Sequence, residues 1–216
     1  MFSLIINGLF IGYWLKLRYV FKQQTKMNTI LDIEINSVIE QAELFCTKEE
    51  IEIKLVYKLS NKSLEIISER SRELSTLYYV DVDMLKTRAE NGCFILKKND
   101  RIYGHIFVHE HLVKGHSVFE RTSLWVDREC RNYNLGLLLM YKMTELFSDS
   151  FLISVAQTPK VHYYNELLGM THVTLAKMSA GLVEELEKLG KLRDEHSFRY
   201  YVNECFESEI GHLKQI

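Results

Sequence analysis

The stretch LWVDRECRNYNLGLLLM, from Leu124 to Met140, predicts a strand, a short polar loop and a helix in immediate succession. The apolar residues before the loop are typical of a strand, and the apolar run from Leu135 to about Phe147 is typical of a helix. Between these elements the chain places an arginine, two asparagines and a glycine. Any short polar loop would connect the two elements, so this choice of residues indicates that the loop has a function.

A loop between a strand and a helix presents unpaired backbone N–H groups at the N-terminus of the helix. Together with the helix dipole, these groups suit phosphate oxygens. Asn134 and Gly136 allow the backbone to come close to a ligand, because glycine has no side chain and asparagine tolerates a positive φ. Arg131 adds a side chain that can make charge-assisted hydrogen bonds to phosphate. We therefore predict that the loop binds a pyrophosphate.

The hydrophobic pattern of the rest of the chain predicts a mixed α/β fold. Asn99 and Asp100 are expected to form the turn of a hairpin. The strands Ser117–Val126 and Phe151–Gln157 are separated by one helix, which is the length of a crossover unit, so they are expected to be parallel and the other strands antiparallel. Strands are expected over residues 51–59, 93–98, 101–112, 116–126, 151–157, 170–178 and 197–206, and helices over 61–77, 82–92, 135–147, 159–169 and 179–193.

Composition and charge exclude several classes of protein. The chain has 216 residues, of which 47% are hydrophobic, and this is enough for one folded domain with a single core. The formal net charge of −2 gives no overall attraction for nucleic acid. The four cysteines have no spacing of metal ligands, which is typical of reduced thiols in a cytoplasmic protein. They are Cys46, Cys93, Cys130 and Cys205.

Residues 1–50 are predicted to be a partly helical N-terminal segment ahead of a domain over residues 51–216. The uncharged run from Met1 to Leu15 is shorter than the roughly 20 residues of a membrane-spanning helix. It also lacks the basic start and the cleavage site of a secretory signal. Three alternatives stay open: residues 1–22 contact a membrane, they form a helix that packs on the domain, or the native chain starts at Met27. The last two are favoured, because nothing downstream is typical of a secreted or membrane-bound protein.

The opening stretch resembles the acetyl-CoA motif of the GCN5-related N-acetyltransferases, in which an apolar strand leads to Arg or Gln-x-x-Gly-x-Gly or Ala and then to a helix. Arg131 matches the first position and Gly136 the last, while Asn134 stands in place of the first glycine. Downstream, VHYYNELLGM resembles the second motif of the family, in which a tyrosine on a short helix precedes Gly-Phe. Gly169 and Met170 match that pair.

The order of the predicted elements matches the family from Ile51 to Phe206. The resemblance implies that Ser117–Val126 and Phe151–Gln157 splay apart to hold acetyl-CoA as co-substrate. It also implies direct transfer of the acetyl group to a primary amine of a small molecule or a protein, without a metal. The residues implied to bind CoA are Leu124, Trp125, Val126, Arg131, Asn132, Tyr133, Asn134, Leu135, Gly136 and Leu137.

The attacking amine must first lose a proton, so the reaction needs a base. Glu120 is the first candidate, because it lies on the strand that the resemblance places against the thioester. A carboxylate that points inward from an apolar strand is expected to have a raised pKa. The alternative is that Glu120 faces solvent or pairs with Arg121 or a neighbouring strand.

Tyr164 is the residue that the resemblance implies as proton donor to the departing CoA thiolate. The family commonly has this tyrosine four residues before the glycine, whereas Tyr164 precedes Gly169 by five. One residue turns a helix by about 100°. The alternative interpretation is an aromatic side chain that packs the helix onto the sheet.

Three histidines in HIFVHEH predict a second polar surface. His105, His109 and His111 fall on one face of a strand, because side chains alternate along it. A His-x-His pair on a strand can bind zinc, but nothing at a convincing spacing completes the site. We therefore expect no metal and a polar surface on the substrate side, where His109 or Glu110 is an alternative base.

Two hypotheses about function follow. The first is a CoA-dependent N-acyltransferase. The second is a catalytically inactive acyl-CoA-binding or assembly protein of the same fold, which Asn134 and the displaced Tyr164 favour. The segment from Ala176 to His196 has a charged face and an apolar stripe, so it is expected either to cover the sheet or to form a homodimer contact. Because it lies between the last two strands, it could also shape the choice of acceptor.

Overall fold

The computed structural model describes residues 33–73, 79–192 and 198–204. The chain forms two compact units, Met1–Glu40 and Gln41–Ile216. In the first unit the described residues, 33–40, are helical. The alternatives for residues 1–22 and the start at Met27 lie outside the described residues. Within the described ranges, no helix combines the length and the apolar character needed to cross a bilayer.

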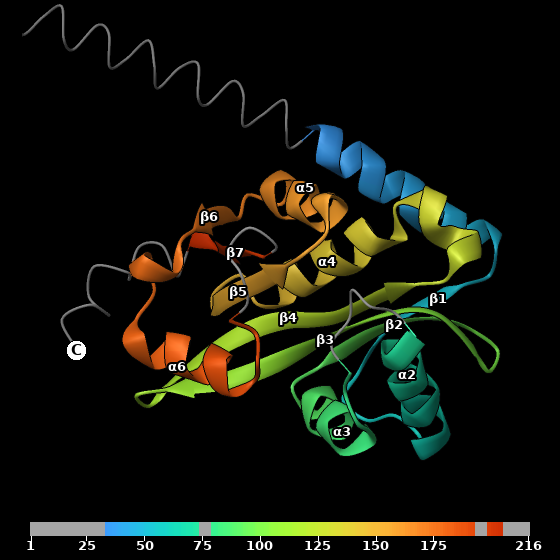
Figure 1. The fold of residues 1–216 in the computed structure, drawn as a ribbon. Coiled ribbons are helices and arrows are strands. Elements are labelled where there is room, and N and C mark those ends of the chain that lie inside the picture. The colour runs from blue at the N-terminus through green and yellow to red at the C-terminus, as the bar shows by residue number, and fades with distance from the viewer. Residues whose placement is uncertain (1–32, 74–78, 193–197, 205–216) are drawn as a thin grey trace, which may run out of the picture. The chain divides into compact units, whose positions relative to one another are not determined.

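The second unit is built on a sheet whose strands follow the order β1-β2-β3-β4-β5-β7-β6 (Figure 1). Strands β4 and β5 are parallel, and all the other neighbouring pairs are antiparallel. This confirms the predicted mixed α/β class with one parallel pair. The strands are β1 Glu52–Val56, β2 Cys93–Lys98, β3 Arg101–Val113, β4 His116–Val126, β5 Phe151–Ala156, β6 Thr171–Val173 and β7 Arg199–Val202.

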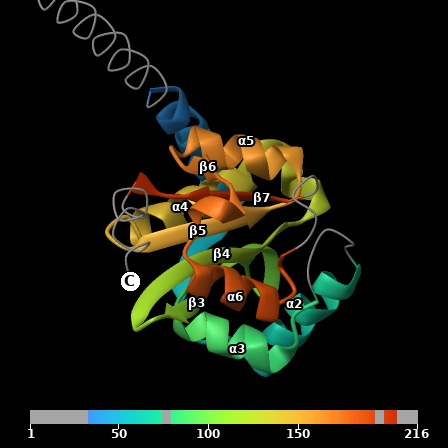
Figure 2. The ribbon, with the colours of Figure 1, turned by 60° about the vertical axis from the view of Figure 1, so that its left-hand side comes forward.

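Helices cover both faces of this sheet (Figures 1 and 2). The helices α4 and α5 lie on one face, which is called the α4 face below, while α2, α3 and α6 lie on the other, called the α3 face. The bounds are α2 Asn61–Glu73, α3 Val82–Glu90, α4 Leu135–Leu146, α5 Pro159–Leu167 and α6 Ala180–Lys188.

Local signals in the sequence account for the ends of several elements. The β2–β3 hairpin turns at Asn99 and Asp100, as predicted, and Asn99 has a φ of 53°. The side chain of Ser60 accepts a hydrogen bond from the backbone N–H of Ser63 at 3.2 Å. Ser179 caps α6 in the same way, through the N–H of Leu182. Such caps satisfy N–H groups that the helix leaves unpaired, so they define where each helix begins.

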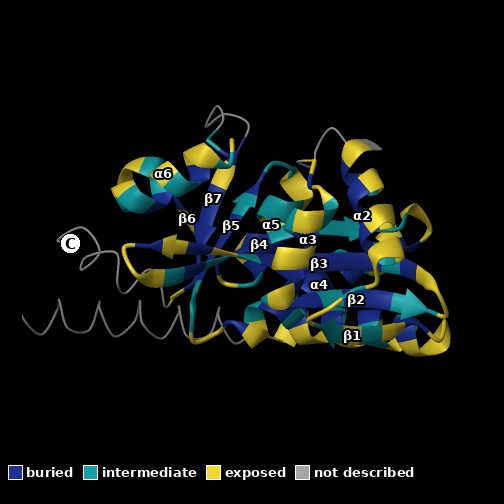
Figure 3. Ribbon diagram, turned by 90° about the horizontal axis from the view of Figure 1, so that it is seen from below, coloured by how far each residue is buried: buried dark blue, intermediate teal, exposed yellow. Residues whose placement is uncertain are grey.

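Buried residues are concentrated on the strands of the sheet and on the helices that pack against it (Figure 3). Helix α4 is apolar nearly all round, and its residues Leu135, Leu137, Leu138, Leu139, Met140 and Met143 are buried. On the α3 face, one cluster joins α2 and α3 to β2 and β3, and another joins α6 to β3, β4, β5 and β7. Cys46, Cys93 and Cys130 are free and buried, while Cys205 lies outside the described residues.

Two local predictions were wrong in detail. The expected strand over residues 170–178 is strand only at Thr171–Val173, and a short 3₁₀ helix, Leu175–Lys177, follows it. The polar loop of the opening stretch also contains a 3₁₀ helix, Arg128–Tyr133, that the sequence pattern did not indicate. Elements of three to six residues have too few positions to show a hydrophobic period, so tertiary contacts decide them.

Gly104 lies where β3, β4 and α4 meet, and we expect Gly104→Ala to destabilise the fold. A Cβ there would be 2.9 Å from Cδ1 of buried Leu96 and 3.2 Å from the carbonyl oxygen of Trp125. Overpacking of this kind costs about 1–3 kcal/mol of unfolding free energy, which urea denaturation can measure. Gly136→Ala is the control, because its Cβ would have its nearest neighbour at 3.5 Å. Equal stability of both variants would contradict the prediction.

Candidate functional site

Strands β4 and β5 separate halfway along their length. Their pairing runs from Val118–Phe151 to Arg121–Ser154 and then stops, while β5 continues to pair with β7 as far as Ala156. Among the described residues, the C-terminal half of β4 therefore pairs with no strand on the β5 side. In open α/β sheets, ligands bind in crevices beyond the carboxyl ends of parallel strands.

A β-bulge in β4 lies just beyond the point of separation. Phe107 of β3 is opposite Thr122, and His105 is opposite Trp125, so Ser123 and Leu124 together oppose one residue of β3. Ser123 has a φ of 53°, a left-handed conformation that is uncommon for a residue with a side chain. Bulges re-aim the strand and leave backbone groups unpaired, and they are over-represented next to active sites.

A cavity of about 210 Å³ opens at this point. It is bordered by the bulge on one side, by the end of β5 on the other, and by side chains from both faces of the sheet. From the α3 face come Leu85 and His105, and from the α4 face come Met140 and Val161. The strand residues that line it include Glu120, Thr122, Ser123, Leu124, Val155 and Ala156, and Gln157 and Lys191 line it as well.

The N-terminus of α4 opens next to the separated strands. Asn134 precedes the helix with φ 55° and ψ 22°, the left-handed conformation that the sequence predicted it would tolerate, and its side chain does not cap the helix. The first N–H groups of α4, which belong to Leu135, Gly136 and Leu137, therefore have no side-chain partner at the cap. An uncapped helix N-terminus preceded by a left-handed residue is suited to an anion.

The side chains of the predicted CoA-binding loop have other contacts. Arg131 donates from Nε to the carbonyl of Val126 at 3.1 Å, and Tyr133 stacks on Phe45 with ring centroids 3.7 Å apart. Leu135 and Leu137 are buried in the core and Asn132 is exposed. Only the backbone of Leu135 and Leu137 can therefore face a ligand, so their predicted part in binding reduces to main-chain N–H groups.

The three residues after the bulge point to both faces of the sheet. Leu124 and Val126 point toward the start of α4. Cδ2 of Leu124 lies 4.0 Å, and Cγ2 of Val126 lies 3.8 Å, from the position that a Cβ on Gly136 would take. Trp125 points to the α3 face, where it stacks on His105 and carries Arg70 over its ring. The backbone of this segment is thus held in place by packing on both sides.

Tyr164 lies against the start of α4. Its Cε2 atom is 3.5 Å from the position that a Cβ on Gly136 would take, and its hydroxyl is 3.4 Å from Oδ1 of Asn134, a long hydrogen bond. Burial, followed by the neighbouring Tyr163, raises the pKa of Tyr164 to about 12. The structure therefore brings Tyr164 next to the predicted pyrophosphate loop, with its proton retained at neutral pH.

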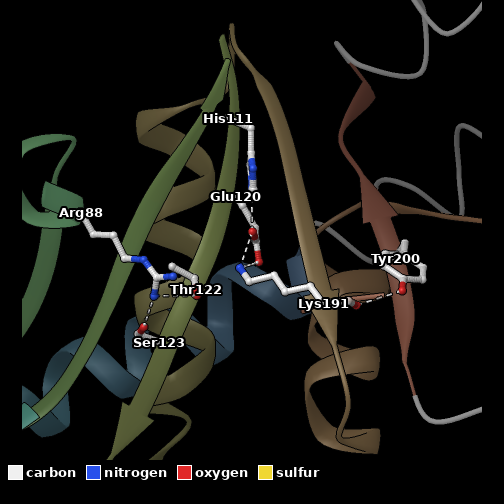
Figure 4. A network of polar contacts seen from close by, with 7 residues as sticks. All are labelled: Arg88, His111, Glu120, Thr122, Ser123, Lys191 and Tyr200. Atoms are coloured by element: carbon white, nitrogen blue, oxygen red, sulfur yellow. Dashed lines mark hydrogen bonds and ion pairs between the residues drawn. The ribbon is translucent and has the colours of Figure 1, made fainter. Parts of the chain in front are cut away.

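Glu120 is fully buried and held by two partners (Figure 4). Nζ of Lys191 lies 2.6 and 2.5 Å from its two carboxylate oxygens, and Nε2 of His111 lies 2.8 Å from Oε2. Burial alone raises the pKa of a carboxyl group, but Lys191 and His111 outweigh it, so the pKa of Glu120 lies below its ordinary value. The predicted raised pKa was wrong, because a buried lysine neutralises the carboxylate. Of the alternatives for Glu120, pairing with a neighbouring strand is confirmed by His111 of β3, whereas Arg121 points to the α4 face.

The histidines of β3 lie on the α3 face. His105 donates from Nδ1 to the carbonyl of Ser123 at 2.8 Å, and burial followed by Arg70 lowers its pKa to about 3. Burial and His111 lower the pKa of His109 to about 4, so both imidazoles are neutral at pH 7. Among the described residues, no group of three or more His, Cys, Asp or Glu side chains could hold a metal ion. Glu110 is exposed and accepts a hydrogen bond from Ser117.

Lys191 and Arg88 are site residues that sequence reasoning missed. Lys191 follows α6 and is 4% exposed, and Arg88 lies on α3 and is 2% exposed. The helical period of α3 could have indicated Arg88, because it falls on the same side as buried Leu85, three residues earlier. No comparable signal marked Lys191, which lies in a lysine-rich and glutamate-rich segment typical of a solvated helix.

Comparison with known proteins gives matches at the level of structure. No family model matches the sequence, and no curated protein matches it. The N-acetylglutamate synthase of Neisseria gonorrhoeae, in complex with coenzyme A and N-acetyl-glutamate, is similar with a TM-score of 0.55 at 11% identity, over 70% of this chain. This chain spans only 35% of the length of that enzyme.

Two smaller proteins are matched over nearly their whole length. The Mycobacterium tuberculosis protein Rv2747, in complex with CoA, has a TM-score of 0.53 at 10% identity, covering 70% of this chain and 98% of that one. An acetyltransferase from Streptococcus agalactiae has a TM-score of 0.52 at 13% identity, covering 71% and 97%. At such identities the likeness concerns the fold. The described part of the chain has the fold of the GCN5-related N-acetyltransferases.

Proposed function

We propose that this chain is an N-acyltransferase that transfers the acetyl group of acetyl-CoA to a primary amine. The observation that carries the proposal is one arrangement: the uncapped N-terminus of α4 opens beside the unpaired half of β4, next to a cavity. The N–H groups of Leu135, Gly136 and Leu137 would bind the pyrophosphate. The exposed edge of Leu124, Trp125 and Val126 would pair with the pantetheine amides in the manner of an added strand.

The reaction we propose is a direct attack. The amine nitrogen bonds to the carbonyl carbon of the thioester, the C–S bond breaks, and the products are an N-acetylated acceptor and the CoA thiol. A backbone N–H at the bulge, near Leu124, would stabilise the charge that develops on the carbonyl oxygen. Tyr164 would donate to the thiolate: its raised pKa keeps the phenol protonated at neutral pH, and it also makes Tyr164 a weak acid. Relatives of the fold that are solved with coenzyme A and an acetylated amino acid support this class of reaction.

The base stays a prediction with two candidates. Glu120 is ionised at neutral pH, but a carboxylate with a lowered pKa that is bound to Lys191 is a weak base. His109 is half-buried on the same face and neutral, and its ring lies 4.7 Å from that of His111. The lowered pKa of His109, about 4, makes it a weak base as well, so we favour a proton path that passes through a water molecule over one that starts at either side chain.

The alternative is an acyl-CoA-binding protein without catalysis. Two observations favour it: the Tyr164 hydroxyl is directed at Asn134, and Glu120 is neutralised by Lys191. The two functions are separated by measuring acetyl-CoA binding by calorimetry and then CoA thiol release with a panel of amines. We expect both binding and release. Binding without release on every amine would support the alternative, and a lack of binding would remove both.

A further inference from the structure

Arg88 is a buried cation with one side of its guanidinium group unused. We propose that the acceptor amine also carries a carboxylate, which Arg88 binds beside the bulge of β4, so that the acceptor is an amino acid or a compound of that kind. This inference rests on the proposed function, since it names the substrate class of the same site. Its support comes from hydrogen bonds, burial and charge around Arg88.

Arg88 lies behind the bulge and contacts two residues that line the cavity. Its Nη1 donates to Oγ of Ser123 at 3.1 Å and lies 3.5 Å from Oγ1 of Thr122, and both of these residues line the cavity (Figure 4). Leu85, one turn earlier on α3, lines the cavity as well. The two hydroxyl groups thus fix the guanidinium at the place where the strand leaves its regular pairing.

The other side of the guanidinium has no partner among the described residues. Nε of Arg88 is enclosed and makes no hydrogen bond, and within the described ranges the hydrogen bonds of the side chain all run through Nη1. Nε–H and the neighbouring Nη2–H point in the same direction, so they form the fork that takes both oxygens of a carboxylate. The buried Nε–H without an acceptor costs free energy, and a ligand carboxylate would remove that cost.

The charges nearby leave Arg88 uncompensated. In the described ranges no carboxylate lies within ion-pair distance of Arg88; Glu120 and Asp81 act on it only from further away. Glu120 is already shared by Lys191 and His111. Burial lowers the pKa of Arg88, as expected for a guanidinium without a close counter-ion. The cavity therefore has an excess of positive charge on the α3 face.

Arg121 shows that burial of an arginine does not by itself mean a binding site. It is 4% exposed and also lacks a carboxylate partner among the described residues. Its Nη1 donates to Oγ1 of Thr144 and to the carbonyl of Met140, and its Nη2 contacts Asn165 and Met170. Arg121 lines the cavity, and its Nε is unpartnered as in Arg88, but its Nη2 is occupied, so it has no free fork. Both terminal nitrogens join β4 to α4 and α5, so Arg121 has a structural role and serves as the control.

The test compares each of several L-amino acids with its carboxamide, using the full chain and acetyl-CoA, with CoA thiol release as the readout. L-glutamate, L-alanine and glycine are the acids, and glutamic acid 1-amide, alaninamide and glycinamide are the matched amides. We expect kcat/KM for at least one acid to exceed that of its amide by about 100-fold. The amine of an amide loses its proton more easily, so chemical reactivity alone would favour the amide.

Arg88→Met removes the fork and keeps the length of the side chain. We expect this variant to raise KM for the preferred acid about 100-fold and to reduce the preference over its amide to within about threefold, with acetyl-CoA affinity unchanged. Arg88→Lys is expected to recover part of the loss, because a lysine keeps the charge without the fork. Arg121→Met should lower stability and leave the preference intact.

The outcomes separate this inference from the proposed function. If amides or simple amines are acetylated as well as the acids, the carboxylate is not recognised and the inference fails, while the N-acyltransferase assignment stands. The same holds if Arg88→Met keeps the preference. If Arg88→Met does not fold, the comparison of acid with amide on the original chain still decides. Release of CoA with none of the amines would refute both.

Discussion

Acetyl-CoA is expected to bind a Gly136→Glu variant about 100-fold more weakly than it binds the original chain, with no loss of stability. Gly136 is the second residue of α4, and its N–H belongs to the uncapped end that we propose binds the pyrophosphate. A carboxylate there would occupy the anion site and repel the phosphates. Like charges brought together at an interface cost several kcal/mol, and about 100-fold in affinity corresponds to about 2.7 kcal/mol.

The same substitution should be neutral or favourable for folding. The nearest neighbours of a Cβ at Gly136 would be Cε2 of Tyr164 at 3.5 Å, Cγ2 of Val126 at 3.8 Å and Cδ2 of Leu124 at 4.0 Å, which are ordinary contact distances. Glycine in a helix costs up to about 1 kcal/mol relative to better helix formers, and an acidic residue in the first turn contributes about 0.3–1 kcal/mol. Urea denaturation should therefore give an unchanged or higher unfolding free energy.

Gly136→Gln separates charge from bulk. It has the same size as the glutamate variant and no charge, so we expect acetyl-CoA binding to fall by much less, about tenfold, as measured by calorimetry at constant salt. Undiminished binding of acetyl-CoA to Gly136→Glu would place the nucleotide elsewhere. That result would remove the basis of the proposed reaction, because no acetyl-CoA would then be held where β4 and β5 separate.

The sequence was a good guide wherever a feature depends on neighbouring residues. The hairpin turn at Asn99, the start of a helix near Ser179 and the left-handed Asn134 are set by local backbone preference, and all three were predicted. These features are encoded within one or two turns of chain, which is the range over which sequence patterns are reliable. The parallel pairing of β4 and β5 followed instead from the length of one crossover unit.

Features that depend on distant residues were not predictable. Lys191 and Glu120 are 71 positions apart, and nothing in either segment indicates that they meet. The bulge at Ser123 is equally invisible, because the extra residue is defined only against the register of β3. The pKa of Glu120 was predicted in the wrong direction for the same reason, because burial was considered without the contact to Lys191. The unused fork of Arg88 also depends on a contact across 35 positions.

Glu120→Gln is expected to cost about 3–5 kcal/mol of unfolding free energy. The substitution keeps the size of the side chain but leaves Lys191 as an unpaired buried charge, and loss of one partner from a buried ion pair has this magnitude. Urea denaturation at pH 7 is the measurement. The control is Glu185→Gln, which removes a partner of Lys188 at the surface and should have little effect on the unfolding free energy.

The stability that Glu120→Gln loses should depend on pH, and the direction of that dependence follows from the lowered pKa of Glu120. Lys191 and His111 hold the pKa of Glu120 below its ordinary value of 4.5, so the folded state favours the carboxylate more than the unfolded chain does. The stability from this pairing is therefore fully present above about pH 4.5 and is lost as the pH falls toward the lowered pKa. The difference in unfolding free energy between the original chain and Glu120→Gln should be constant from pH 6 to 8 and should become smaller below pH 4.5.

The double variant Glu120→Gln with Lys191→Met separates the two roles that Glu120 could have. Replacement of a buried ion pair by apolar or neutral groups of similar volume is often neutral, so most of the lost stability should return. If Glu120 only holds Lys191 in place, CoA release with an accepted amine should return as well. If Glu120 is the base, the double variant should be stable and still inactive. A Glu120→Gln variant as stable as the original chain would show that the pair is not a structural lock, and the lowered pKa would then no longer argue against Glu120 as the base.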